Sequence, residues 1–351
     1  MTKKTLLTIV KTVLPLLLGV YLIWVFFANM AEDPKKLSAF YKAISEANYW
    51  WILLSVILGV VAYFSRAYRW KYVLEPLGYK TNFWHRYHAV MIGYLINLTI
   101  PRAGEASRSA MLYRSDGVPF STSFGTIIAE RAIDLIMLGS IAFLTAVLGY
   151  DDFFEIKTQI IEKFGGSSHA SSNGFPWKYV IYGVIALAFL GMAYLFLFNL
   201  NFRKKLLGFV KDVLAGLFSI FKSKQPLGYI FHTLIIWGCY IVMFALPFQA
   251  LEETSSIPFQ GILLGFIAGS LGITFTNGGI GTYPLLVGLV VAFYISKTSD
   301  VDGTGVGNAL GMLVWITQTF LMIVLGLLSL VLLPKNYTQE KENEQISEPG
   351  K

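Results

Sequence analysis

Long apolar stretches separated by short polar segments dominate this chain, and they predict helices that cross a membrane. Six of them are long enough to span the hydrocarbon layer, which takes about 20 apolar residues in a helix. They are residues 5–27, 49–65, 121–149, 177–200, 228–250 and 308–333, each bounded by charges or turn residues. The sequence therefore predicts an all-α polytopic membrane protein.

Two further apolar stretches end in breaks. Residues 87–100 run into Pro101–Glu105, and residues 259–275 run into Thr276–Pro284, which is rich in glycine. Lipid cannot satisfy the backbone groups that such a break exposes, so each break must be buried in protein or line a wet cavity. We therefore expect two re-entrant broken hairpins in addition to the six full spans.

The placement of Lys and Arg favours hairpins over crossings. If both stretches turn back and the N-terminus is cytoplasmic, the inner segments carry 20 basic residues, five of them in a loop at 66–86, and the outer loops carry seven. If the first stretch crossed instead, the six basic residues of 201–226 would lie outside, against the positive-inside rule. This predicts an inner-membrane protein with both termini in the cytoplasm.

The predicted topology contains an inverted repeat. Each half, about 1–150 and 177–334, is predicted to contain two spans, a hairpin and a third span. Because each half crosses the membrane three times, the second half has the opposite orientation to the first. Both halves would form one membrane domain over 1–334, followed by a polar cytoplasmic tail over 335–351. Inverted repeats with matching broken segments point to a transporter-like site at the bilayer midplane. The alternative is that loops of similar length arose by chance.

Composition agrees with this picture. Of 351 residues, 55% are hydrophobic and 14% are charged, whereas soluble domains carry about a quarter charged residues. No long polar block remains for a soluble catalytic module. We expect the first apolar stretch to be a retained span because no cleavage site follows it, and the single cysteine, Cys239, excludes an intramolecular disulfide.

Charged residues inside a membrane region are costly and usually face the protein interior or a cavity. Two groups are expected there: Arg102, Glu105 and Arg108 at the first break, and Glu130, Arg131 and Asp134 in the third span. Helical spacing lets either arginine of the first group approach Glu105, and lets Arg131 reach Asp134. Three arginines and three acids would balance, as burial requires. One interpretation is that these ion pairs only hold the hairpin against the third span. The other is that Arg102 and Arg108 bind a lipid phosphate, with Glu105 limiting the affinity. Both can be true.

The second break offers backbone groups rather than charges. Asn277, Gly278, Gly279 and Gly281 can expose N–H and C=O groups. If Tyr283 and Pro284 open the next helix, its positive dipole end would point at the break and favour an anionic headgroup. The alternative is a tight glycine turn that only reverses the hairpin.

Enzyme signatures are absent. The four histidines form no metal-ligand spacing, and neither a nucleophile elbow nor a nucleotide-binding glycine loop occurs. We expect no metal, no cofactor and no enzymatic activity of the chain by itself. The alternative is an embedded acid/base pair that uses Glu105 with Glu130 or Asp134, because burial can raise carboxyl pKa values towards neutrality.

Three motifs in order resemble the lysylphosphatidylglycerol synthase transmembrane region, also called the flippase-like domain. They are Asn-Leu-Thr-Ile-Pro-Arg-Ala-Gly-Glu-Ala-Ser-Arg at 97–108, Glu-Arg-Ala-Ile-Asp at 130–134 and Asn-Gly-Gly-Ile-Gly at 277–281. The resemblance implies an inner-membrane domain that moves an aminoacylated or otherwise modified anionic lipid between leaflets. The family's fused synthase domain has no counterpart here, so synthase activity is not expected. Many relatives also carry Pro-Gly-Gly and a following acid at the second break, where this chain has Asn277 and Tyr283-Pro284.

The expected function is therefore flippase-like binding and translocation of an anionic or aminoacylated phospholipid. Nucleic acid is not an expected partner, and a lipid-modifying enzyme is. Two alternatives are a membrane-embedded transferase that acts on a lipid-phosphate substrate and a non-transporting lipid-binding partner of such an enzyme. Product formation by purified protein would indicate the first, and lipid binding without transbilayer movement the second.

Overall fold

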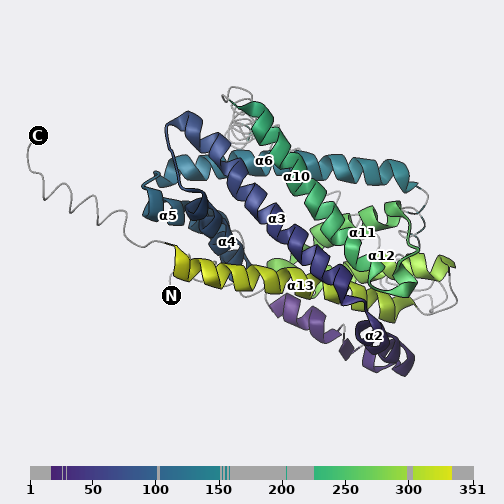
Figure 1. Cartoon of the computed structure of the whole chain (residues 1–351). Coiled ribbons are helices and arrows are strands. Elements are labelled where there is room, and N and C mark those ends of the chain that lie inside the picture. The colour runs from purple at the N-terminus through teal and green to yellow at the C-terminus, as the bar shows by residue number, and fades with distance from the viewer. Residues whose placement is uncertain are drawn as a thin grey trace, which may run out of the picture.

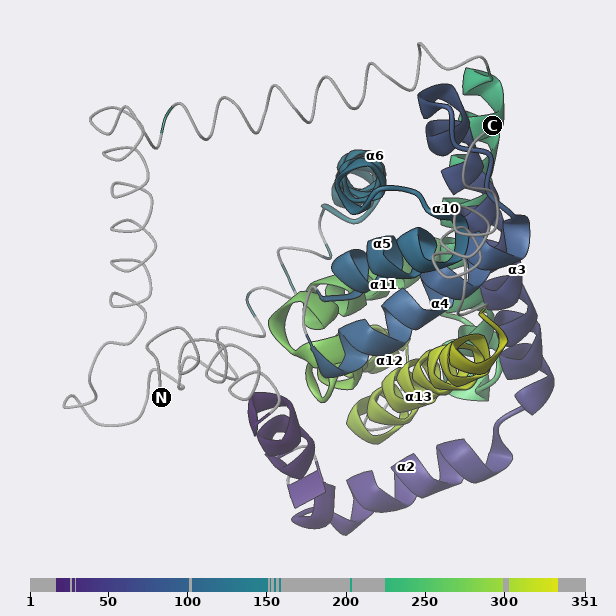
Figure 2. The same ribbon diagram turned by 90° about the vertical axis from the view of Figure 1, so that its left-hand side faces the viewer.

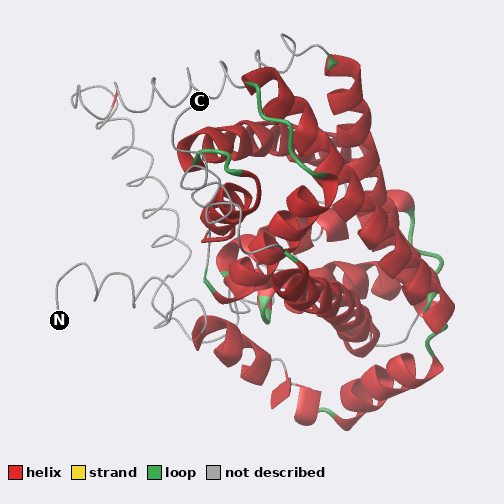
Figure 3. Ribbon diagram, turned by 60° about the vertical axis from the view of Figure 1, so that its left-hand side comes forward, coloured by secondary structure: helices red, strands yellow, loops and turns green. Residues whose placement is uncertain are grey.

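The computed structural model describes most of the chain: residues 17–100 without 26 and 29, 103–150, 225–298 and 303–333, with single residues 152, 155, 158 and 203. All the secondary structure within these ranges is helical (Figure 3). Several predicted features fall outside them, namely Arg102, the span at 177–200, most of the basic loop at 201–226, the polar tail, and residues 5–16 of the first span.

Nine α-helices and four short 3₁₀ helices are bounded within the described ranges. The α-helices are α2 (Pro34–Glu46), α3 (Tyr49–Leu74), α4 (Phe83–Thr99), α5 (Ala103–Asp116), α6 (Phe120–Leu148), α10 (Pro226–Ala245), α11 (Phe259–Phe275), α12 (Thr282–Thr298) and α13 (Gly303–Leu332). The 3₁₀ helices are η1 (Glu75–Leu77), η2 (Leu246–Gln249), η3 (Glu252–Thr254) and η4 (Asn277–Gly279).

Four helical segments are long and apolar enough to cross a membrane: Tyr49–Leu77, Phe120–Leu148, Pro226–Gln249 and Gly303–Leu332. They confirm four of the six predicted spans. The first extends well beyond its predicted end at residue 65, because α3 continues to Leu74. The prediction of a loop from residue 66 was wrong: Arg66 and Arg69 interrupt the apolar run, but they lie on a helix whose next turn carries the buried Trp70 and Leu74.

The segment between the first two spans also differs from the prediction. The sequence predicts an outer loop here, yet residues 34–46 form helix α2. Asp33 caps this helix by accepting a hydrogen bond from the Lys35 backbone N–H at 3.0 Å, and Pro34 occupies the first turn. Both are ordinary signals for a helix start. The buried side chains of Phe40 and Ala43 face the core, and α2 packs against α13.

The first break folds as a helical hairpin. Helices α4 and α5 pack against each other on either side of residues 100–102. Gly93 and Gly104 permit this approach, since a Cβ on Gly104 would overlap the Gly93 carbonyl oxygen and the Asn97 side chain. The Gly104 backbone N–H donates to the Asn97 side-chain oxygen at 2.7 Å, which satisfies one of the free N–H groups at the start of α5.

A methyl group at Gly104 should therefore separate α4 from α5. We expect Gly104→Ala to lower the free energy of unfolding by about 1–3 kcal/mol, the usual cost of overpacking, measured by thermal unfolding in detergent. Gly125→Ala is the matched control, because Gly125 lies on α6 with no neighbouring atom within 4 Å of its added Cβ. Equal stability of the two variants would show that the hairpin contact is looser than the structure implies.

The second break forms a similar hairpin from α11, η4 and α12. The short 3₁₀ helix η4 holds the turn, and α12 begins at Thr282. Helix α12 in turn packs along α13. Of all the helix pairs in the described structure, these two share the most extensive contact. Each of the two apolar stretches is therefore one helix of a packed helix pair.

Of the hydrophobic cores in the described residues, the two largest each include side chains from one of these hairpins. One centres on Tyr63, Trp70, Met91, Leu112 and Ile127 and also takes in Leu321 from α13. The other is built from α10–α13 together with residues of α2. Figures 1 and 2 show the long helices α3 and α10 side by side. This pair and the contact of α13 with α4 join the two parts of the chain.

One further link joins the end of α6 to the end of α12. Asp152 accepts hydrogen bonds from Tyr294 Oη at 2.6 Å and from Lys297 Nζ at 2.7 Å. Lys297 also forms an ion pair with Glu155 at 2.6 Å. Burial acts to raise the pKa of Asp152, but the donated hydrogen bonds and the positive charge lower that pKa below its ordinary value.

Candidate functional site

The charged residues predicted at the first break and in the third span come together between α5 and α6. Arg108 of α5 donates two hydrogen bonds to Glu130 of α6, at 2.9 and 3.3 Å. The side chains of Arg108 and Glu130 are only 5% and 1% exposed. The Arg108 guanidinium also lies over the Trp70 ring, 3.7 Å from its centroid. This bidentate, stacked geometry is the arrangement to which arginine is suited.

Glu105 has a different partner from the one expected. It pairs with Arg131 of α6 at 3.1 Å, whereas the sequence spacing allows Arg108 or Arg102, the latter outside the described residues. Arg108 instead pairs with Glu130 of α6. The pairing of Arg131 with Asp134 is confirmed, at 3.8 Å. The Arg131 side chain is 42% exposed, which makes it the most accessible member of the group.

Two arginines of α3, which the sequence prediction had placed in a loop, complete the cluster. Arg66 Nη2 donates to Asp134 Oδ2 at 2.9 Å, and Arg69 Nη1 lies 2.9 Å from Asp134 Oδ1. Arg69 Nη2 is also 3.8 Å from Glu130. Arg66 is 3% exposed and Arg69 is fully buried. Their i, i+3 spacing within a continuing helical pattern is the signal that could have found them.

These two arginines add to the predicted set of three arginines and three acids, of which Arg102 lies outside the described residues. Among the described residues the cluster holds four guanidinium groups against three carboxylates: Arg66, Arg69, Arg108 and Arg131 against Glu105, Glu130 and Asp134. As ions they leave one positive charge in excess. Because an uncompensated ion at membrane depth is expensive, an excess of this sign favours an anionic guest.

The residues predicted at the second break meet the first break directly. The Asn277 side-chain amide donates to the Thr99 carbonyl at 3.3 Å, and a Cβ on Gly278 would touch Leu98. Gly278 has a φ of +60°, a conformation that costs other residues about 1–2 kcal/mol. Trp315 Nε1 donates to the Gly278 carbonyl at 2.8 Å and holds the turn against α13. Gly279 and Gly281 continue the same turn, with positive φ values as well.

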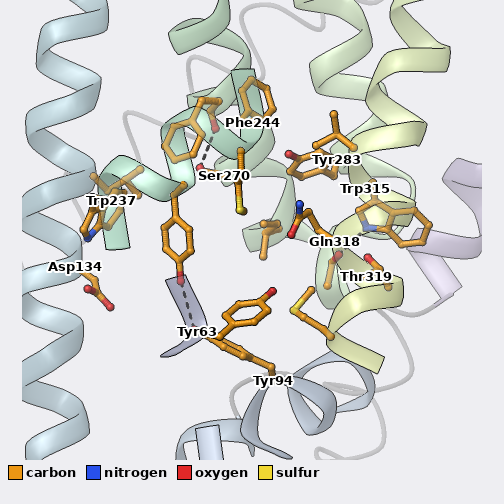
Figure 4. Close-up of a pocket in the computed structure, with 18 of the residues that line it drawn as sticks. Tyr63, Tyr94, Asp134, Trp237, Phe244, Ser270, Tyr283, Trp315, Gln318 and Thr319 are labelled. Carbon is orange, nitrogen blue, oxygen red and sulfur yellow. Dashed lines mark hydrogen bonds between the residues drawn. The ribbon is translucent and has the colours of Figure 1, made fainter. Parts of the chain in front are cut away.

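A cavity of about 460 Å³ connects the cluster to this turn. Arg66, Arg131 and Asp134 line it at the cluster, and Gly278, Tyr283 and Trp315 line it at the second break. Figure 4 shows the rings of Tyr63, Tyr94, Tyr283 and Trp315 around this space. Arg108 and Glu130 do not line it. The sequence therefore identified residues at both ends of the cavity, but not the aromatic wall between them.

The described histidines are engaged in contacts away from the cavity. His85 Nδ1 lies 3.0 Å from Asp116, His88 Nδ1 lies 2.9 Å from Ser329 Oγ, and His232 Nδ1 lies 2.8 Å from Ser65 Oγ. In the part of the chain that the structure describes, no three residues of the types His, Cys, Asp and Glu are placed to hold a metal ion.

Comparison with known proteins finds one family and two curated relatives. The family model described as lysylphosphatidylglycerol synthase TM region matches residues 12–301. The UPF0104 membrane protein MJ1595 of Methanocaldococcus jannaschii is 30% identical over 112 residues, which are 31% of this chain and 33% of that protein. The glycosyltransferase AglD of Haloferax volcanii is 28% identical over 148 residues, 40% of this chain and 23% of that protein. The matches thus span a third or less of either relative. No solved structure matches the chain.

Proposed function

This chain is a multi-pass membrane protein that belongs to the lysylphosphatidylglycerol synthase TM region family, and from that premise we propose that it binds an anionic or aminoacylated phospholipid and moves it between leaflets. The observation that carries the proposal is the largely buried cluster, whose described residues leave one positive charge in excess and which opens into a cavity between two broken helices. Binding at helix breaks near the midplane is how many secondary transporters hold their substrates.

The proposed architecture is six spans and two re-entrant hairpins in two inverted halves, at about 1–150 and 177–334, within one membrane domain. The paired hairpins support it, because α4–α5 in the first half and α11–α12 in the second meet at their turns. In this arrangement the two tips approach each other from opposite sides of the membrane. Their contact would open and close as the lipid passes.

The sequence-predicted residues take different parts in this proposal. The turn of Asn277, Gly278, Gly279 and Gly281, together with Arg102 and Glu105 at the first break, forms the headgroup path. Arg108 was predicted to hold lipid phosphate, but both of its terminal nitrogens already bond to Glu130. We therefore assign Arg108 and Glu130 to holding α5 on α6, and Arg131 and Asp134 to the edge of the lipid site.

Orientation in the inner membrane can be tested by cysteine labelling in a Cys239→Ser background. We expect Ser45→Cys on α2 to react with a membrane-impermeant thiol reagent in intact cells. Lys80→Cys, in the loop between α3 and α4, should react only after the cells are opened. Both positions are exposed in the structure, so a lack of reaction reports the side of the membrane. Labelling of Lys80→Cys in intact cells would contradict the proposed placement of both termini in the cytoplasm.

Translocation itself can be tested with purified protein in proteoliposomes. Fluorescent phosphatidylglycerol in the inner leaflet should become accessible to an external, membrane-impermeant reductant faster than in protein-free vesicles. If the lipid binds but its transbilayer rate equals that of empty vesicles, the chain is a lipid-binding partner of another enzyme and the transport proposal is wrong.

A second candidate function is a membrane-embedded transferase, because one relative, matched over 40% of this chain, is named a glycosyltransferase. Glu105 with Glu130 or Asp134 would then supply an acid and a base. Appearance of a modified lipid when purified protein is incubated with phospholipid and a sugar donor would support this alternative.

A further inference from the structure

We propose that Arg66, on α3, is the residue that holds the lipid phosphate, inside the tyrosine-lined cavity and away from the first break. This inference rests on the proposed lipid function and names the group that recognises the substrate. It assigns the phosphate to a side chain that the sequence pattern alone had placed in a loop.

The first argument is the state of the Arg66 guanidinium. Its Nη2 atom donates to Asp134, while Nε and Nη1 are buried and have no hydrogen-bond partner. The residue is only 3% exposed and lines the 460 Å³ cavity. Leaving buried donors unpaired costs about 1–3 kcal/mol each, and more for a charged group. Nη1 forms a fork with Nη2, so a phosphate that displaces Asp134 from Nη2 can bind this fork through two of its oxygens.

The second argument comes from the other arginines of the cluster. The terminal nitrogens of Arg108 are used by Glu130 and its face is covered by Trp70. Arg69 also has unpartnered nitrogens, but it does not line the cavity. Arg131 lines the cavity and pairs with Glu105. Among these four, Arg66 alone combines free buried donors with access to the cavity.

The third argument is the rest of the cavity wall. The Trp237 indole N–H is a further buried donor without a partner, and Tyr94 and Tyr240 bring their hydroxyl oxygens within 3.4 Å of each other. Beyond these groups the lining is mostly apolar, with side chains such as Leu138 and Phe266. Donors at one end and an apolar remainder fit a phosphate that carries a hydrocarbon-bearing group, rather than free phosphate.

Asp134 gives the site a built-in competitor. One oxygen of this carboxylate binds Arg66 and the other faces Arg69. A phosphate that takes over Arg66 therefore leaves Asp134 paired with Arg69, so no carboxylate is stranded. A phosphodiester carries one negative charge, which equals the excess of the described cluster. Exchange between carboxylate and phosphate would let the lipid leave again, as a transporter requires.

The test compares Arg66→Lys with Arg69→Lys. Each variant replaces a guanidinium on α3 by an ammonium, the two positions are about one turn apart, and both side chains pair with Asp134. Binding of phosphatidylglycerol, diacylglycerol and inorganic phosphate to the purified full chain is measured by native mass spectrometry, beside thermal stability. We expect Arg66→Lys to weaken phosphatidylglycerol binding by about tenfold or more, as loss of a bidentate charge-assisted contact implies. Arg69→Lys should change the affinity for phosphatidylglycerol less than about threefold, although it should lower the thermal stability about as much as Arg66→Lys does. Diacylglycerol should bind weakly to all variants.

Asp134→Asn provides a second measurement that does not depend on the folding of the arginine variants. Removing the competing charge should tighten phosphatidylglycerol binding several-fold. Equal losses in the two lysine variants, or no gain with Asp134→Asn, would overturn the assignment of Arg66. Displacement of the lipid by millimolar inorganic phosphate would show that the site binds free phosphate, and would overturn the proposal that it binds a lipid. If binding depends on Arg66 but proteoliposomes show no translocation, the phosphate site stands and the transport proposal fails.

Discussion

Replacement of Glu130 by Gln is expected to lower the free energy of unfolding by about 3–5 kcal/mol, because it leaves the buried Arg108 without a carboxylate partner. The Glu130 side chain is 1% exposed and accepts hydrogen bonds from both terminal nitrogens of Arg108. It also lies 3.8 Å from Arg69, so its loss deepens the positive excess of the cluster. The change should appear as a lower unfolding temperature in detergent.

The double variant Arg108→Met with Glu130→Leu should recover much of that loss. Removing an opposite-charge pair leaves no stranded ion, and apolar residues of similar volume can pack in its place. Glu46→Gln is the control on a surface pair, since Lys42 and Glu46 are 64% and 65% exposed, and it should cost less than about 1 kcal/mol. A double variant as unstable as Glu130→Gln would argue that the pair does more than hold α5 on α6.

Much of the helix framework follows from local sequence patterns. The apolar runs gave four spans that the structure confirms, and the two Pro- and Gly-containing breaks fold as helical hairpins at the predicted places. These features depend on hydropathy and on the backbone, which are encoded within about 20 neighbouring residues. Helix α2 was missed although Asp33 and Pro34 form an ordinary helix start. Here the polar composition of the segment outweighed its capping signal.

The site could be predicted only in part, because its key contacts join distant segments. Arg66 and Asp134 are 68 residues apart, and Asn277 and Thr99 are 178 residues apart. Nothing in the spacing of Glu130, Arg131 and Asp134 shows which helix will face them. From hydropathy, Arg66 and Arg69 also mark the end of a span. In the structure both lie buried on α3, where they pair with the carboxylate of Asp134 on α6. A buried partner therefore lets the helix continue past the two arginines.

A disulfide between the two hairpin tips is expected to stop lipid movement completely. A Cβ on Gly278 would lie 3.8 Å from Leu98 Cα, which brings the two Cα atoms within the 6.8 Å or so that a disulfide can span. Leu98→Cys with Gly278→Cys, in a Cys239→Ser background, should therefore cross-link under mild oxidation. The positive φ of Gly278 strains a cysteine there by about 1–2 kcal/mol, and each single-cysteine variant controls for that strain.

The initial rate of phosphatidylglycerol translocation by this double-cysteine protein, measured in the same proteoliposomes before and after reduction, tests most directly whether lipid passes between the two hairpins. The oxidised protein should show only the rate of protein-free vesicles, and a reductant should restore the rate of the single-cysteine variants. An oxidised, cross-linked protein that still moves lipid at the reduced rate would contradict a path that opens where the two hairpin tips meet.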